Sequence, residues 1–183
     1  MAVKTALPVI LGAGAEMKAS FCISRGNVIF PGQYLGDMKQ RETAVYYGRA
    51  LRHMTTLYEL EPEYLACDLH PQFLSTAAAL SSLPSFRGER LPVQHHHAHL
   101  AACLLENGRD GPALGAIFDG TGYGSDGTAW GGEFLAGGPS GFTRAGHFLP
   151  APLPGGDRAV MEPWRFALSM LALSVGEEEA PRL

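Results

Sequence analysis

The sequence is short of charged residues, of cysteine and of long apolar runs, and each shortage excludes a class of protein. Only 17% of the 183 residues are charged and 46% are hydrophobic, which is typical of a folded globular chain and excludes a disordered one. No apolar stretch is long enough to cross a bilayer, and no basic segment followed by an apolar core stands at the N-terminus. The net charge of −4 gives no general reason to expect nucleic acid as a partner. We therefore expect a cytoplasmic protein that binds neither membranes nor nucleic acid.

The three cysteines, Cys22, Cys67 and Cys103, are far apart in the sequence and odd in number. They match no zinc-ribbon or disulfide spacing, which suits a reducing compartment. Each stands in an apolar context that favours a buried, unreactive thiol. The chain therefore offers no obvious nucleophile of its own.

Histidine, in contrast, is concentrated in one place. Four of the seven histidines fall within five positions, in the run VQHHHAH from Val93 to His99. If a helix begins near His95, then His95 and His99 lie one turn apart on the same face. Two imidazoles at this spacing can hold one metal ion, and a carboxylate at the tip of a neighbouring strand, Asp119, can supply a third ligand. The sequence thus predicts a metal site formed by His95, His99 and Asp119.

Three other interpretations of the histidine run fit the sequence less well. A single histidine is more often a core residue than a ligand, but four together beside Asp119 favour a site. Expression tags are normally terminal, whereas this run is internal and leads into an apolar helical pattern. A zinc protease needs a glutamate directly after the first histidine, and His96 occupies that position.

A glycine-rich segment follows the histidines at the end of an apolar run. From Phe118 to Gly127 the sequence reads FDGTGYGSDG, and we expect a strand at 114–119 followed by a glycine-rich turn at 120–127. Glycines let backbone N–H groups approach phosphate oxygens closely. The candidate cofactor-binding residues here are Gly120, Thr121, Gly122, Tyr123, Gly124 and Asp126. Together with the histidines they favour a metal and a phosphorylated ligand bound side by side.

A second glycine-rich segment lies near the N-terminus. Gly12 and Gly14 follow an expected strand at 7–11 and permit a tight turn, and Lys18 could direct a cation at a phosphate there. An ordinary hairpin with a surface lysine is the alternative. We expect two further strands at 19–24 and 28–30, with a turn at 25–27.

The remaining chain alternates helical and strand patterns, as α/β proteins do. We expect helices at 41–60, 73–83, 95–107 and 162–173, strands at 64–67, 91–94, 128–135 and 142–148, and a frayed tail at 176–179. The strand at 64–67 ends in Asp68 and His70, which are further site candidates because ligands bind at the carboxyl ends of strands in open α/β sheets. Turn capping is their alternative role. Asp157, Glu162 and Arg165 are expected to cap a helix or contact a ligand.

The order strand, glycine-rich turn, strand, turn, strand at 7–30 returns at 114–148. This repeat of layout predicts two similar units, residues 1–110 and 111–183, whose glycine-rich hairpins flank one cleft.

Four motifs in a fixed order carry a family resemblance. They are VQHHHAH at 93–99, DGTGYG at 119–124, WGGEF at 130–134 and LPGGD at 153–157. Together they closely resemble the HypF-type hydrogenase maturation carbamoyltransferases. The resemblance lies in the domain that this family shares with tRNA threonylcarbamoyl transferases and antibiotic O-carbamoyltransferases, and it runs from Leu11 to Arg165.

The resemblance implies an actin-like ATPase, ribonuclease-H-like α/β fold, with a complete first lobe and a truncated second one. It implies one iron or zinc ion on His95, His99 and Asp119, with ATP and carbamoyl-adenylate, made from carbamoyl phosphate, as the nucleotide. Lys18 and His70 are the candidate catalytic residues. The implied partner is a HypE-type maturation protein that accepts the carbamoyl group on its C-terminal cysteine, as a step of cyanide ligand synthesis.

Members of this family carry acylphosphatase-like, zinc-finger and adenylate-forming domains upstream, so we expect a fragment that is incomplete alone. Three alternatives stay open: an O-carbamoyltransferase acting on a small-molecule hydroxyl, a non-catalytic metal- or nucleotide-binding module, and an actin-like kinase. A kinase binds magnesium through oxygens, whereas the histidines favour softer metals.

Overall fold

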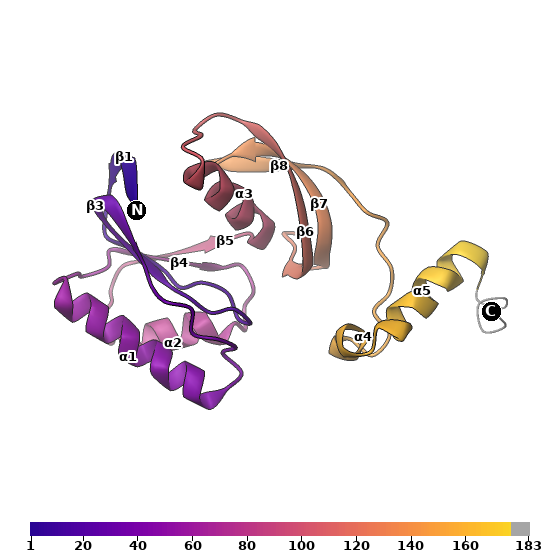
Figure 1. Ribbon diagram of the computed structural model, residues 1–183, viewed down its shortest axis with the longest axis horizontal. Helices are drawn as coiled ribbons and strands as arrows, with labels where there is room; N and C mark the ends of the chain where they lie inside the picture. The colour runs from indigo at the N-terminus through magenta and orange to yellow at the C-terminus, as the bar shows by residue number, and fades with distance from the viewer. Residues whose placement is uncertain (177–183) are drawn as a thin grey trace. The chain divides into compact units, whose positions relative to one another are not determined.

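The computed structural model describes residues 1–176, which fall into two compact units. The first unit is Met1–Gly146, and the second, His147–Leu183, is described as far as Gly176. The described part is a mixed α/β structure with two sheets, both of which Figure 1 shows with their helices. No helix within residues 1–176 has both the length and the apolar character needed to cross a membrane.

The first sheet has five strands in the order β1-β3-β2-β4-β5. Its strands are β1 (Ala2–Leu7), β2 (Ile10–Gly12), β3 (Cys22–Pro31), β4 (Tyr64–Asp68) and β5 (Glu89–Val93). β2 pairs antiparallel with β3 and parallel with β4, and β4 pairs parallel with β5. Parallel neighbours need a crossover, which α2 (Leu74–Ser82) provides between β4 and β5. The carboxyl ends of β4 and β5 therefore lie next to each other.

The predicted turn at 25–27 is wrong, because β3 runs through it as one strand. Gly26 has a φ of 58°, and the register between β1 and β3 shifts in this region. A glycine with positive φ in an irregular ladder forms a bulge, which bends a strand without ending it. The predicted strands at 19–24 and 28–30 are therefore parts of one element.

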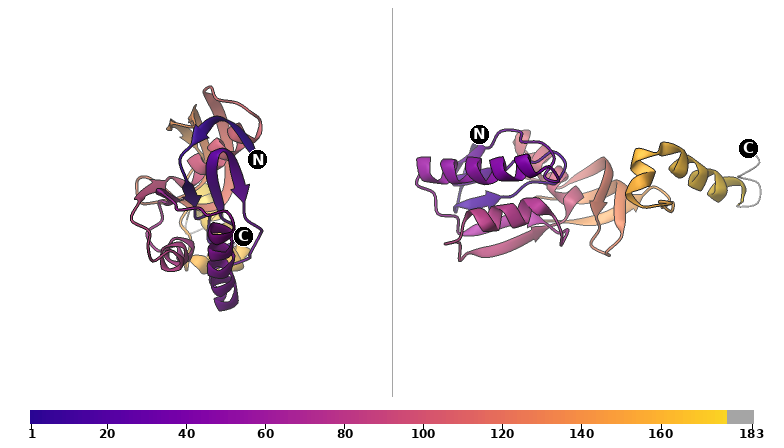
Figure 2. Two further views of the ribbon diagram at one scale, coloured as in Figure 1. Left: turned by 90° about the vertical axis from the view of Figure 1, so that its left-hand side faces the viewer. Right: turned by 90° about the horizontal axis from the view of Figure 1, so that it is seen from below.

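Two helices lie side by side against the first sheet, as Figures 1 and 2 show. α1 (Arg41–Leu57) inserts Tyr47 and Leu51 into a core that also contains Leu11, Ile23 and Leu65. The buried Tyr47 hydroxyl donates to the Ala13 carbonyl at 2.8 Å, which ties the helix to the end of β2. α1 ends three residues before the predicted 60, because Glu59 adopts a left-handed conformation with a φ of 51°.

The second sheet has three antiparallel strands in the order β6-β7-β8. They are β6 (Ala113–Tyr123), β7 (Ala129–Gly138) and β8 (Gly141–His147). α3 (His95–Glu106) starts directly after β5 and packs Leu100 and Leu104 against Trp130 and Leu135 of this sheet. The predicted helix stop is confirmed, since Gly108 takes a φ of 63° just past the end of α3.

The glycine-rich segment is more regular than predicted. β6 continues through Tyr123, and only Gly124 to Thr128 turns, with the Gly124 N–H donating to the Thr128 carbonyl at 2.8 Å. The register between β6 and β7 shifts between Phe118 and Gly122. The expected turn at 120–127 was wrong in its first half, because glycines inside a strand pattern often form a bulge.

The predicted repeat of layout holds only for one hairpin in each sheet. β2 and β3 form an antiparallel pair, as do β6 and β7. The predicted second and third strands of the first repeat, 19–24 and 28–30, are one strand, β3. In the second repeat the three predicted strands are separate: β6, β7 and β8. The lobe boundary near residue 110 stays a prediction.

The second unit contains α4 (Asp157–Met161) and α5 (Pro163–Val175). The predicted helix at 162–173 is confirmed, with Pro163 in its first turn, where a missing N–H costs nothing. Glu162 occupies the N-cap but makes no side-chain cap; it accepts from the Arg165 Nε at 2.7 Å instead. The predicted tail at 176–179 lies, apart from Gly176, outside the described residues.

Candidate metal centre

The two candidate histidine ligands stand at the start of α3, as the sequence predicts. α3 begins at His95 because Gln94 caps it, its Oε1 accepting from the His97 N–H at 2.9 Å. The Gln94 Nε2 donates to the Tyr123 carbonyl at 3.1 Å and so fastens the helix start to the end of β6. Gln94 gives no signal for this role in the sequence, since glutamine is not among the preferred N-cap residues.

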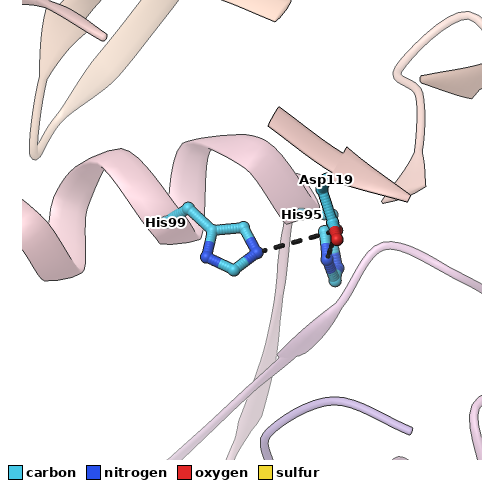
Figure 3. Close-up of side chains that lie close together, drawn as sticks. All are labelled: His95, His99 and Asp119. Carbon is cyan, nitrogen blue, oxygen red and sulfur yellow. Dashed lines mark hydrogen bonds and ion pairs between the residues drawn. The ribbon is translucent and has the colours of Figure 1, made fainter. Parts of the chain in front are cut away.

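The structure brings His95, His99 and Asp119 together. The His95 Nε2 lies 2.8 Å from the Asp119 Oδ2, and the His99 Nε2 lies 3.7 Å from the same oxygen. Figure 3 shows both rings beside the carboxylate, with the histidines on successive turns of α3 and the aspartate on β6. One ligand atom from each residue lies within 4.8 Å of the other two.

This donor set fits a transition metal ion. Zinc or iron at about 2.0–2.1 Å from nitrogen and oxygen ligands would hold neighbouring donor atoms roughly 3.3 Å apart. The two separations from the Asp119 oxygen, 2.8 and 3.7 Å, lie on either side of that value, and the three ligand atoms lie within 4.8 Å of one another. Two imidazoles and one carboxylate on one side of an ion leave its other positions open. The open side is that of His99, whose side chain is 54% exposed against 13% for His95.

A second carboxylate holds His95 from behind. The Asp68 Oδ2 lies 2.6 Å from the His95 Nδ1, and the Asp68 Oδ1 accepts from the His70 N–H at 2.8 Å. Asp68 is the last residue of β4 and pairs with Val93 of β5, which stands two positions before the first residue of α3. The sequence placed Asp68 and His70 at a strand end; their position beside His95 follows from the pairing of β4 with β5.

These contacts change the protonation of the site. The hydrogen bond to Asp68 raises the pKa of His95 above its usual value near 6.5, although burial acts in the opposite direction. Burial by itself raises the pKa of Asp119, but the Gly120 N–H and His95 outweigh it and hold that pKa below its usual value. In the metal-free chain the contacts with Asp68 and Asp119 therefore favour the protonated form of His95, whose two ring nitrogens both face carboxylates.

The metal-free chain should lose stability as the pH rises. A histidine whose pKa is raised by folding contributes stability below its unfolded pKa of about 6.5, and this contribution disappears as the pH rises through the folded pKa. We expect the midpoint temperature of thermal unfolding, measured with a chelator present, to decrease as the pH rises from 6.5 through the raised pKa of folded His95. The His95→Gln variant should lack that fall, and an equal fall in the variant would assign it to other groups.

The other two clustered histidines are structural. His96 is fully buried beside Gln94, and its pKa is lowered by burial and by the neighbouring His95. The His97 Nε2 lies 2.8 Å from the Gly138 carbonyl, which joins α3 to the end of β7. The interpretation as a core residue thus holds for His96, whereas His97 is only partly buried.

The glycine-rich residues of β6 differ in their surroundings. Gly120 and Thr121 are exposed at the bulge, whereas Gly122 is buried against the histidines. Gly124 lies against Trp130, where a Cβ atom would come within 2.2 Å of the indole nitrogen. The Asp126 Oδ1 accepts from the Thr128 N–H and hydroxyl and from the Trp130 Nε1, and these Thr128 bonds lower its pKa. Asp126 thus has a turn-forming role, and nucleotide contacts by these residues stay a prediction.

Substitution of Gly122 by alanine should disturb the centre, because a Cβ atom there would lie 2.7 Å from the rings of both His95 and His96. We expect metal affinity to fall by roughly tenfold, the lower end of the effect of disturbing residues around a metal site. Gly120→Ala is the matched control, since a Cβ atom at Gly120 meets nothing within 4 Å. Competition titration with a chromophoric chelator measures both. Equal affinities in the two variants would contradict the prediction.

The predicted nucleotide-contacting residues near the N-terminus are Gly12, Gly14 and Lys18, which lie in and after β2. Gly12 pairs with Cys22 and Ala66 inside the first sheet. Gly14, with a φ of 75°, packs against the Ser20 carbonyl, and its own carbonyl accepts from the Ser75 hydroxyl at 3.0 Å. Lys18 is exposed in the loop between β2 and β3. Their proposed roles toward a nucleotide stay predictions.

His70 lies beside the centre. Its backbone N–H bonds to Asp68, and its ring stacks on Phe73 at 4.5 Å and meets the Tyr123 ring edge-on at 5.3 Å. The structure thus places the candidate catalytic histidine next to Tyr123, one of the predicted cofactor-binding residues.

A groove of about 470 Å³ runs between α3 and β6, and both His99 and Asp119 line it. The rest of its lining is mostly apolar and includes Leu100, Leu114 and Cys103. Cys103 is exposed and lines this groove, so its predicted burial is wrong. Cys22 and Cys67 are partly buried, and burial raises the pKa of both thiols.

Comparison with known families matches nearly the whole chain. The model of the HypF Kae1-like domain matches residues 5–106, and that of the second subdomain of the carbamoyltransferase Kae1-like domain matches residues 115–182. The chain belongs to the HypF Kae1-like domain family. The four sequence motifs had indicated this family.

Two curated relatives of the HypF domain are carbamoyltransferases by name. HypF2 of Cupriavidus necator is 43% identical over 172 residues, which cover 93% of this chain and 21% of that protein. HypF of Rhizobium leguminosarum bv. viciae is 38% identical over 177 residues, which cover 96% of this chain and 23% of that protein. The chain thus spans about a fifth of the length of these relatives.

Two crystal structures share the fold. Full-length HypF in its phosphate- and nucleotide-bound form superposes with a TM-score of 0.87 at 31% identity, over 99% of this chain and 26% of that one. HypF of T. kodakarensis superposes with a TM-score of 0.84 at 32% identity, over 94% of this chain and 23% of that one. The two-sheet arrangement described above is therefore that of the HypF Kae1-like domain.

Proposed function

We propose that this chain is the metal-binding part of a carbamoyltransferase that transfers a carbamoyl group from carbamoyl-adenylate to a protein thiol. The observation that carries the proposal is the convergence of His95, His99 and Asp119 in a HypF Kae1-like domain, where His99 and Asp119 also line a groove. The curated relatives that cover this region bear the name carbamoyltransferase.

In this proposal His95, His99 and Asp119 hold one iron or zinc ion. Such an ion, when bound, polarises the carbamoyl carbonyl or binds a phosphate oxygen. The protein residues fix its position: His95 from the buried side, Asp119 from β6, and His99 from the exposed side. The substrate then approaches along the groove that His99 and Asp119 line.

ATP, as the source of carbamoyl-adenylate, binds next to the ion in this proposal. Support comes from the relative whose crystal structure contains phosphate and nucleotide. At the bulge, Gly120 and Thr121 are exposed and lie outside the matched register of the ladder, so their backbone N–H groups suit a phosphate. We assign Gly12, Gly14 and Lys18 to the other side of the nucleotide, and His70 to proton transfer beside Tyr123.

The carbamoyl acceptor is a thiol of another protein, for which we propose the C-terminal cysteine of a HypE-type maturation partner. The raised thiol pKa values of Cys22 and Cys67 make both poor nucleophiles. We also propose that the first sheet is a complete ribonuclease-H-like lobe of an actin-like fold. β6, β7 and β8 would then belong to a second lobe.

The test uses the chain joined to the preceding segments of a full-length relative, with labelled carbamoyl phosphate, ATP and the HypE-type partner. We expect label on the partner's C-terminal cysteine, and loss of that label when His95 and His99 are both alanine. Labelling that survives the double substitution would refute a role for this centre in transfer.

A second candidate function is that of a non-catalytic metal- or nucleotide-binding module. The observation that favours it is that the chain spans only about a fifth of the length of its relatives. Bound metal without any transfer in the joined protein would favour the module. Labelling of a small-molecule hydroxyl in place of the cysteine would favour an O-carbamoyltransferase.

A further inference from the structure

Asp68 differs from the three candidate ligands in its burial and in its bonding. Its side chain is 7% exposed, and both of its oxygens are already engaged, Oδ2 with the His95 Nδ1 and Oδ1 with the His70 N–H. A carboxylate that is bonded on both oxygens and closed off from solvent is poorly placed to bind an ion beside the exposed His99. Asp68 is therefore unsuited to bind the metal itself.

The contact with Asp68 decides which nitrogen of His95 is left for a metal. The Nδ1 faces the Asp68 Oδ2 at 2.6 Å, so a proton on that nitrogen is shared with a carboxylate. The opposite nitrogen, Nε2, faces Asp119 at 2.8 Å. Histidine ligands commonly donate their second N–H to a carboxylate, which fixes both the tautomer and the orientation of the ring.

The backbone of the first sheet holds Asp68 in place. It pairs with Val93 across the parallel strands β4 and β5, and the Leu69 N–H donates to the Val93 carbonyl at 2.9 Å. The His70 N–H fixes the other carboxylate oxygen. Two residues after Val93, His95 begins α3, so a short and rigid path joins the carboxylate to the ring it holds.

His99 has no comparable support. Within residues 1–176, the carboxylate in ion-pair range of His99 is Asp119, the shared ligand, and the His99 side chain is four times as exposed as that of His95. His95 is thus fixed in position before an ion binds, whereas His99 has to move toward the ion when it binds.

We propose that Asp68 is the positioning residue of the metal centre: it keeps the proton of His95 on Nδ1 and presents Nε2 to the ion. The inference rests on the proposed metal site at His95, His99 and Asp119. Asparagine at position 68 cannot reproduce this arrangement. If its amide oxygen faces the His95 ring, its NH₂ group faces the His70 N–H, and the reverse orientation points NH₂ at Nδ1 and drives the proton to Nε2.

The first experiment measures zinc affinity of the 183-residue chain by competition with a chromophoric chelator, for the wild type, Asp68→Asn and Asp110→Asn. We expect Asp68→Asn to bind roughly 10–100-fold more weakly, the usual cost of losing such a partner. Asp110→Asn is the matched control, because it removes an exposed carboxylate paired with Lys4, and it should bind as the wild type does. Equal affinity of Asp68→Asn and wild type overturns the inference but leaves the metal site standing. No binding by the wild type refutes the metal site itself.

The second experiment needs no variant and therefore does not depend on how Asp68→Asn folds. ¹⁵N-labelled histidine in the zinc-loaded wild type reports the state of each ring nitrogen by NMR. We expect a His95 signal with a protonated Nδ1 and a metal-bound Nε2. Metal bound through Nδ1, or no proton on that nitrogen, overturns the inference. The same spectrum of zinc-loaded Asp68→Asn, recorded in addition, tests for a purely structural role: an unchanged His95 tautomer in that variant counts against the proposal.

Discussion

Replacement of His95 and His99 together by alanine should abolish metal binding by this chain. The change removes two of the three ligands and leaves Asp119, a single half-buried carboxylate, which cannot hold zinc or iron at micromolar concentration. We expect elemental analysis of the purified wild type to find about one equivalent of metal, because three protein ligands form one mononuclear site. The double variant should contain none.

The control for this experiment removes the same number of histidines elsewhere. His53 and His147 are both exposed and lie outside the cluster at the start of α3, so His53→Ala/His147→Ala should retain the metal content of the wild type. Metal lost equally from both double variants would mean that binding is non-specific and that the predicted centre does not exist. Circular dichroism checks that each variant keeps its secondary structure.

Replacement of Arg144 by alanine should cause a large loss of stability. Glu133 lies on β7 with a side chain only 2% exposed, and Arg144 of β8 binds it through two hydrogen bonds, from Nε at 2.6 Å and from Nη2 at 2.9 Å. The guanidinium also lies over the Trp130 ring at 4.0 Å. Removing one partner of a buried pair leaves an uncompensated charge, which costs about 3–5 kcal/mol. Urea denaturation measures the free energy of unfolding.

Two variants test the cause of this loss. Arg165→Ala also removes an arginine that pairs with a carboxylate and lies over a tryptophan, but its partner Glu162 is 41% exposed, so we expect at most about 1 kcal/mol. Glu133→Gln added to Arg144→Ala should restore part of the lost stability, because it removes the unpaired charge. No recovery in that double variant would assign the loss to the Trp130 contact instead.

Much of the site could be predicted because its signals are local in the sequence. The i, i+4 spacing of His95 and His99 fixes a shared helix face as soon as α3 forms, and α3 begins and ends close to where the sequence indicates. The apolar run before Asp119 predicted a strand, and the helices at 41–57, 74–82 and 163–175 follow from periodicity and proline. Periodicity could not show that Gly26 and Gly120 bend strands without ending them, because the same residue suits a turn and a bulge.

The partners across the fold could not be predicted in the same way. Asp68 was a candidate only as a polar residue at a strand end, and nothing within its own segment points to His95, which is 27 residues away. Gln94 carried no cap signal, and the buried pair of Glu133 with Arg144 depends on the register between β7 and β8.

The sequence by itself determined which residues are able to bind a metal and that two of them share a helix face, because helix geometry depends on spacing alone. Only the tertiary structure decided that Asp119 completes the set and that Asp68 stands behind His95. The physical reason is that β4 and β5 pair in parallel and end together, while α3 packs on β6, so carboxylates from two different sheets reach the same imidazole. Strand pairing and packing determine this convergence, and neither can be predicted from a local sequence pattern.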